Sequence, residues 1–99
     1  MSDDRQDTAP IAHDAQARRF RVEVDGHAAV LEYTRDGDLM TITHTGVPAA
    51  IGGRGVAARL VEAAALHARA AGLRVRPACS YAVAWFARHR EFADLLQPG

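Results

Sequence analysis

The glycine-rich run at residues 52–55 has residue types and spacing suited to binding a ligand. Gly52, Gly53 and Gly55 surround Arg54, and a stretch of strong helix formers follows directly. A glycine turn that leads into a helix leaves backbone N–H groups free at the positive end of the helix dipole, and the missing Cβ atoms let a ligand come close. The run therefore predicts an anion-binding loop, usually for phosphate, in which Arg54 adds a charged contact. The alternative is a plain glycine turn before a helix.

Cys79 is the only cysteine of the chain and the residue best suited to nucleophilic chemistry. It follows a predicted strand and precedes a predicted helix, with Arg76 and Arg88 close to it in the sequence. A helix N-terminus and nearby cations favour the thiolate form of a cysteine, which is the nucleophile. We therefore predict Cys79 as a catalytic residue. Three roles stay open for it: a covalent nucleophile, a residue that lines the site, or a small hydrophobic residue of the core.

Other side chains could assist, and each has a structural alternative. His44, near the end of a predicted strand, could act as a catalytic base, or it could be a satisfied structural histidine. Tyr81 and Trp85 are four residues apart and share a helix face, which could line a ligand groove or pack into the core. Arg88 could hold a phosphate or form a surface ion pair. The five histidines are scattered and no Cys/His cluster exists, so no metal site is predicted.

Composition limits the classes of function. The chain has 99 residues, enough for one small domain, and its formal net charge is zero. The charge is uneven, because residues 51–90 hold seven arginines against one glutamate, which suits a polyanionic ligand. Zero net charge and few aromatic residues disfavour nucleic-acid binding. No run approaches the roughly 20 apolar residues of a membrane span, and the N-terminus lacks the pattern of a signal peptide. With a single cysteine, these features predict a cytoplasmic protein.

Periodicity predicts the elements that must position these residues. Residues 1–16 are polar, contain Pro10 and are predicted to form a disordered tail, so the folded domain is expected over residues 17–99. Alternating apolar residues predict three strands joined by turns at Asp25-Gly26 and Asp36-Gly37. Helical spacing predicts a long helix closed by Gly72, and Ser80 is expected to cap a second helix. The expected order is strands at 19–24, 27–34 and 39–45, a helix at 54–71, a strand at 73–77, a helix at 81–89 and a short helical turn at 91–96.

These elements predict an α/β fold. The first three strands form an antiparallel meander, with Met40, Ile42 and His44 expected on one face of the third strand. The strand at 39–45, the long helix and the strand at 73–77 form a crossover that makes the two strands parallel. The glycine loop then lies at the carboxyl end of the first of them, where open α/β sheets bind ligands. The loop lacks the Gly-Lys-[Ser/Thr] of a Walker A site, and the meander and the absence of further βα repeats argue against a Rossmann domain.

Three segments resemble the GCN5-related N-acetyltransferase superfamily, and within it the small predicted acetyltransferases of about one hundred residues. The resemblance covers roughly residues 19–96, and the run at 79–96, with its Arg-His-x-Glu-aromatic-Ala-Asp-Leu pattern, is the most specific part. The family's loop pattern is Gln/Arg-x-x-Gly-x-Gly/Ala; Gly55 and Ala57 match it, whereas Gly52 stands at the leading position. The segments are residues 44–48, 53–57 and 79–96.

The resemblance implies a minimal version of the family's fold and a site for acetyl-CoA as co-substrate. It implies that backbone amides of the glycine loop hold the pyrophosphate, and that the pantetheine arm lies along the strand ending at Thr45, between two strands that must separate. The small subfamily is suspected of an acetyl-cysteine intermediate, which would involve Cys79. The cofactor-binding residues implied are Thr45, Val47, Gly53, Arg54, Gly55, Val56, Ala57, Trp85 and Arg88, with Cys79 and His44 as catalytic residues.

The leading functional hypothesis is an acetyl-CoA-dependent N-acetyltransferase that acts on a small amine or a protein amine. The alternative is a CoA- or acetyl-CoA-binding module without catalysis, because a domain of this size lacks the extra elements with which larger acetyltransferases build a substrate pocket. The sequence does not identify the acceptor. A small core and an exposed sheet favour a homodimer.

Overall fold

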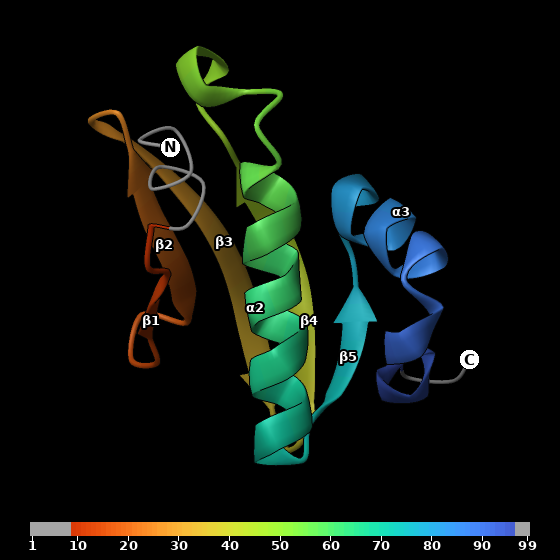
Figure 1. Cartoon of the computed structure of the whole chain (residues 1–99). Helices are drawn as coiled ribbons and strands as arrows, with labels where there is room; N and C mark the ends of the chain where they lie inside the picture. The colour runs from red at the N-terminus through yellow and green to blue at the C-terminus, as the bar shows by residue number, and fades with distance from the viewer. Residues whose placement is uncertain (1–8, 97–99) are drawn as a thin grey trace.

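The protein, seen in a computed structural model, forms a five-stranded sheet covered by helices, and the structure describes residues 9–96 (Figure 1). The strands are β1 (Ala12–Asp14), β2 (Arg19–Val24), β3 (His27–Asp36), β4 (Leu39–Gly46) and β5 (Arg74–Pro77). They lie side by side in chain order, antiparallel from β1 to β4, with β5 parallel to β4. The predicted α/β fold, with its antiparallel meander and its parallel pair, is confirmed.

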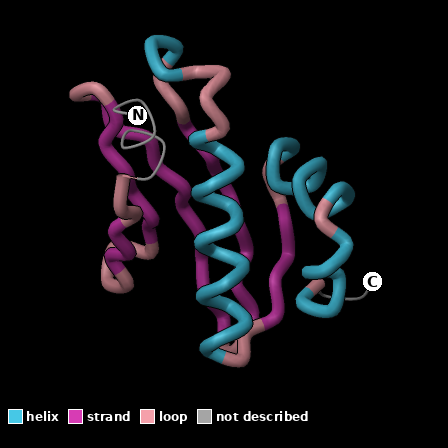
Figure 2. The backbone as a smooth tube through the Cα atoms, in the orientation of Figure 1, coloured by secondary structure: helices cyan, strands magenta, loops and turns pink. Residues whose placement is uncertain are grey.

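Two α-helices and two 3-10 helices complete the described part of the chain, and Figure 2 shows where they lie between and after the strands. They are η1 (Ala49–Ile51), α2 (Val56–Ala71), α3 (Ser80–Arg88) and η2 (Arg90–Leu95). The predicted end of the long helix is confirmed, because Gly72 has a φ of 73° and its N–H bonds back to the last turn. The predicted Ser80 cap is wrong: Cys79 is the N-cap residue, and its side chain makes no capping hydrogen bond.

The core forms one cluster between one face of the sheet and the helices. Along β2, buried Phe20, Val22 and Val24 alternate with residues that point away from the helices. Helix α2 buries small residues, among them Ala64 and Ala68, so its axis can lie close to the sheet. The opposite face of the sheet carries polar residues such as Arg21 and Glu23, whose side chains form an exposed ion pair. A half-buried sheet of this kind gives the alternation that the sequence shows.

A β-bulge changes the direction of the side chains near the end of β4. Glu32 pairs with His44, whereas the next residue, Tyr33, pairs with Ile42, so Thr43 is the extra residue. Side chains of directly paired residues share a face, and Leu31, buried in the core, pairs with Thr45. Thr45 therefore faces the helices and His44 faces the other side. The prediction that His44 shares a face with Met40 and Ile42 is wrong, because a bulge shifts the period by one residue.

The C-terminal run at residues 89–95 folds back through contacts to α2. The guanidinium of Arg69 donates to Asp94 at 2.5 Å and to the carbonyl of Glu91 at 3.1 Å, and it lies 4.9 Å from the centre of the Phe92 ring. His89 stacks on Trp85 at 4.0 Å between ring centres. These contacts pack η2 against α2 and α3, so this part of the pattern is explained by packing.

The N-terminal boundary of the fold differs from the prediction. Residues 12–14 form β1, which pairs with β2, and the carbonyl of Ala9 accepts a hydrogen bond from Arg59 of α2. Ile11 also packs against the core. The predicted disordered tail is therefore wrong for residues 9–16, while its first eight residues lie outside the described part of the chain. A three-residue strand is too short for a period of two to be evident.

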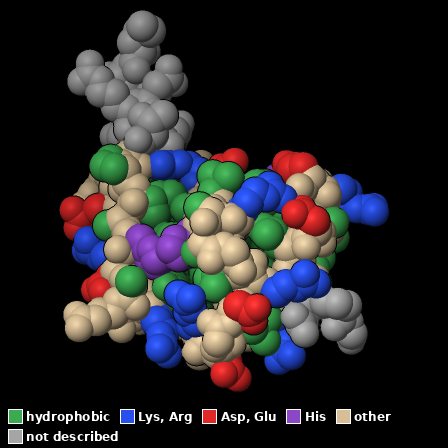
Figure 3. All heavy atoms as spheres, turned by 90° about the horizontal axis from the view of Figure 1, so that it is seen from below, with side chains coloured by type: hydrophobic (Ala, Val, Ile, Leu, Met, Phe, Trp, Pro, Cys, Tyr) green, Lys and Arg blue, Asp and Glu red, His purple; other side chains and the backbone are tan. Residues whose placement is uncertain are grey.

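His13 holds β1 in place. Its ring stacks on Phe20 at 4.1 Å between ring centres, its Nε2 lies 2.7 Å from the Tyr33 hydroxyl, and His67 of α2 meets it edge-on at 4.3 Å. Figure 3 shows histidines gathered on the face seen from below. Burial and the neighbouring His67 lower the pKa of His13 from its ordinary 6.5, and the nearby Asp14 partly opposes this.

We expect the protein to lose stability as the pH falls below about 6.5. The pKa of His13 is lower in the folded protein than in the unfolded chain, so the unfolded chain binds more protons in that range. Urea unfolding at pH 7.5 and at pH 5.5 measures the loss. The variant His13→Phe keeps a ring against Phe20 and should lose less stability between the two pH values than the wild type. The exposed His27 provides the control, since His27→Gln should retain the full dependence; equal dependence in all three proteins would contradict the expectation.

Candidate functional site

The parallel strands β4 and β5 separate before β4 ends. Their pairing runs from Leu39 with Arg74 to Ile42 with Pro77, while β4 continues to Gly46. The carbonyl of Ile42 accepts hydrogen bonds from the N–H groups of Ala78 at 2.9 Å and Cys79 at 3.2 Å. The chain then turns into α3. Beyond Ile42, β4 therefore presents an edge that β5 does not pair, at the carboxyl end of both strands.

Thr45 and Cys79 face each other across this gap. The Thr45 hydroxyl lies 3.5 Å from the Cys79 sulfur, close enough for a hydrogen bond that either atom could donate. The contact depends on the bulge at Thr43, which turns Thr45 toward the helices. Cys79 is half-buried and packs against the core. The structure thus brings the predicted nucleophile together with the predicted strand-end residue.

The glycine loop lies between β4 and α2 and leaves its backbone open. Gly53 and Gly55 have φ values of 79° and 76°, and a Cβ at either would meet no atom within 4 Å. Gly55 is the N-cap of α2 and no side chain caps the helix, so the first N–H groups of α2 have no side-chain acceptor. An anion could approach these amides directly, as the sequence predicts.

The side chains around the loop differ in what they offer a ligand. Arg54 forms an ion pair with Asp25 at 2.8 Å, and both side chains remain partly exposed, at 37% and 36%. Val56 is buried, so only its backbone faces the loop, whereas Ala57 is half-buried. Val47 is half-buried and packs against the core. The loop therefore offers mainly backbone N–H groups and one arginine that already has a carboxylate partner.

Three predicted site residues lie apart from the thiol. His44 is exposed on the face of β4 opposite Thr45, where its Nε2 would lie 2.9 Å from a Cβ on Gly46. Trp85 is only 4% exposed and packs against Phe86, His89 and Phe92, which leaves little indole surface for a ligand. Arg88 is exposed at the far end of α3, about 14 Å along the helix from Cys79 at 1.5 Å per residue.

Two residues of the site were not predicted. Asp25 fixes Arg54, but the sequence marked it only as part of a hairpin turn. Gly46 leaves room for the His44 ring, and the sequence analysis assigned it no role beyond ending the strand. Neither role had a sequence signal. The ion pair of Asp25 joins segments that are distant in the sequence, and the closeness of Gly46 to His44 depends on the local shape of the bulged strand. Within residues 9–96, no group of three or more His, Cys, Asp or Glu could hold a metal ion, and no helix is long and apolar enough to cross a membrane.

The fold and the site define an α/β domain in which an anion-binding loop opens beside a thiol in the gap between two parallel strands. Residues 19–95 match the family described as GCN5-related N-acetyl-transferase. The chain therefore belongs to the GCN5-related N-acetyltransferase family. Its structure is similar to the NMR solution structure of a GCN5-like candidate N-acetyltransferase from Staphylococcus aureus, with a TM-score of 0.73 and 26% sequence identity over 92% of this chain and 90% of that chain.

We expect Gly55→Ala to lower the free energy of unfolding by about 1 kcal/mol, because φ near +76° strains any residue with a Cβ. Urea unfolding at neutral pH measures the change. Gly52→Ala is the matched control, since Gly52 has a φ of −68° and a Cβ there would make an ordinary contact. Equal stability of the two variants would contradict the left-handed conformation of Gly55.

Proposed function

We propose that this protein is an acetyl-CoA-dependent N-acetyltransferase, in which Cys79 lies beside the acetyl group. The observation that carries the proposal is the gap between β4 and β5, in which Thr45 and Cys79 approach to 3.5 Å. Membership of the acetyltransferase family supports the reaction type. The acceptor we propose is an amine, either on a small molecule or on a protein.

The glycine loop would hold the pyrophosphate of the co-substrate. Gly53, Gly55, Val56 and Ala57 can donate backbone N–H groups at the positive end of α2. Arg54 can add a charged contact by exchanging Asp25 for a phosphate oxygen, and the partial exposure of both side chains leaves room for this exchange. The open space beside Gly53 and Gly55 supports the fit, because a phosphate there meets no Cβ.

The edge of β4 beyond Ile42 would hold the pantetheine arm. Its backbone groups lack a partner on β5, so an extended chain carrying amides can bind there as an added strand would. Thr45 and Val47 border this path. The resemblance also implied Arg88 and Trp85. Arg88 could contact only a phosphate far from Cys79, and Trp85 is too buried to contact the co-substrate.

Acetyl-CoA, when bound, supplies an acetyl group as a thioester. On one route the Cys79 thiol loses its proton and the sulfur bonds to the acetyl carbon as CoA leaves as a thiol; the amine then displaces Cys79, which regains a proton. The Thr45 hydroxyl can donate a hydrogen bond to the Cys79 sulfur while it is charged. On the other route the amine attacks the thioester directly and main-chain N–H groups stabilise the oxyanion.

The predicted role of His44 as a base is not part of this proposal, because its side chain lies on the uncovered face of the sheet, opposite Thr45 and Cys79. A single reduced thiol fits a cytoplasmic protein. The face of the sheet that no helix covers is where a second copy would bind in a homodimer.

Intact-protein mass spectrometry after incubation with acetyl-CoA tests the route. We expect one acetyl adduct on the wild type and none on Cys79→Ala, because Cys79 is the only cysteine of the chain. A titration with CoA should give the same dissociation constant for both proteins within about threefold, since the phosphates are held elsewhere.

The outcomes separate the hypotheses. CoA binding without an adduct but with acetylated amine would favour direct attack. CoA binding without any turnover would favour the binding module. Absence of CoA binding would contradict the proposed role of the glycine loop.

A further inference from the structure

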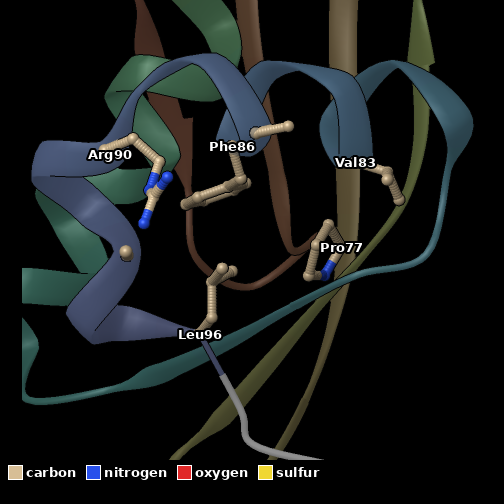
Figure 4. A pocket seen from close by; sticks show the side chains of 7 residues that line it. Pro77, Val83, Phe86, Arg90 and Leu96 are labelled. Carbon is tan, nitrogen blue, oxygen red and sulfur yellow. The ribbon is translucent and has the colours of Figure 1, made fainter.

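An apolar groove lies between α3, η2 and the end of β5, a short way along the chain from Cys79. It has a volume of about 360 Å³ and is open to solvent. Figure 4 shows Val83 and Phe86 of α3, Arg90 of η2, Pro77 of β5 and Leu96 around it. Ala87 and Ala93 complete its lining. Val83 is 51% exposed, one of three large hydrophobic side chains exposed in the described part of the chain, so the groove leaves apolar surface in water.

Arg90 gives the groove its charge. It is the only charged residue of the lining. Within residues 9–96, its guanidinium makes no hydrogen bond and no ion pair. By contrast, the nearby Asp94 is held by Arg69. An apolar floor with one free arginine at its edge is complementary to a ligand that carries an apolar group and a carboxylate.

The groove begins next to Cys79. Pro77 precedes Cys79 by two residues, which limits their separation to about 7 Å in an extended chain. Val83 lies one helical turn beyond Cys79, and its N–H donates to the Cys79 carbonyl at 3.1 Å. Val83, Phe86 and Ala87 follow one another at helical spacing on α3, and Arg90 begins η2 just after α3 ends at Arg88. The groove therefore runs from the Cys79 end of α3 toward Arg90.

The geometry points to an acceptor-binding groove for a polypeptide with an apolar residue next to its acetylated amine and a carboxylate about four residues from that amine. The distance along α3 from Cys79 to the end of the helix is about 14 Å, which an extended peptide spans in about four residues at 3.3–3.6 Å each. The inference rests on the proposed acetyl transfer and names its substrate class. The open groove fits a chain that passes along the surface.

Binding and acetylation of blocked peptides by the full-length protein test this. The probe is Lys-Leu-Ala-Ala-Glu, acetylated at its N-terminus and amidated at its C-terminus, with Gln in place of Glu as the neutral comparison. We expect the Glu peptide to bind about threefold to tenfold more tightly, with a difference that shrinks at high salt. Moving Glu next to Lys should remove the advantage.

Variants of the groove locate the binding. Arg90→Gln should abolish the preference for Glu over Gln and leave CoA affinity unchanged. Arg21→Gln, on the uncovered face of the sheet, is the matched charge control. Val83→Ser should weaken both peptides about threefold. Leu66→Ser on α2 is the matched apolar control, because Leu66 is also 51% exposed.

Two results would overturn the inference: equal affinity for the Glu and Gln peptides, or a preference that survives Arg90→Gln. Peptide binding is measured without acetyl-CoA, so it is independent of turnover.

The two proposals fail in different ways. Absence of CoA binding by the wild-type protein would contradict the proposed function. Acetylation of the peptides that does not depend on Arg90 or Val83 would contradict only the proposed role of the groove. Acetylation of only small free amines would also contradict it.

Discussion

The carbonyl of Ile42 ends the pairing of β4 and β5, and the arrangement of the site depends on this point. It accepts hydrogen bonds from two successive N–H groups, those of Ala78 and Cys79, so β5 cannot continue its ladder. The next residue of β4 is the bulged Thr43. Because of this extra residue, Thr45 faces the helices, whereas strict alternation along the strand would place it on the other face. The end of β4 therefore has an unpaired edge, and the Thr45 hydroxyl lies beside the Cys79 thiol. Without the bulge, His44 would lie on the same face of β4 as Met40 and Ile42.

The core explains why so small a chain can hold this geometry. All of the described core lies on one side of the sheet, and the alanines of α2 let the helix lie near it. The start and the end of that helix are also fixed: Arg59 holds the N-terminal segment at Ala9, and Arg69 holds η2 through Asp94. Helix α2 therefore connects the glycine loop to both ends of the described chain.

The sequence predicted the elements well where periodicity extended over several residues. The strands rich in β-branched residues and the alanine-rich helix were found within about two residues, because local pattern decides them. The site was predicted only in part. Adjacent carboxyl ends of parallel strands place Thr45 and Cys79 together, and this follows from topology. The face of the sheet on which His44 lies could not be predicted. After Ile42, β4 has no alternation of apolar and polar residues that would reveal a bulge. β1 was missed because its attachment depends on the long-range contacts of His13.

The most specific stretch of the sequence does not supply the thiol or the loop but the packing behind them. In residues 88–96, His89 stacks on Trp85, Phe92 lies under Arg69, and Asp94 binds the same arginine. These contacts bury the ring of Trp85, which sequence alone left open as a ligand-binding residue. They also close η2 against α3 in a way that leaves Arg90 on the outside. A distinctive run of sequence can therefore be required by packing, while the residues that it leaves exposed determine what the surface can bind.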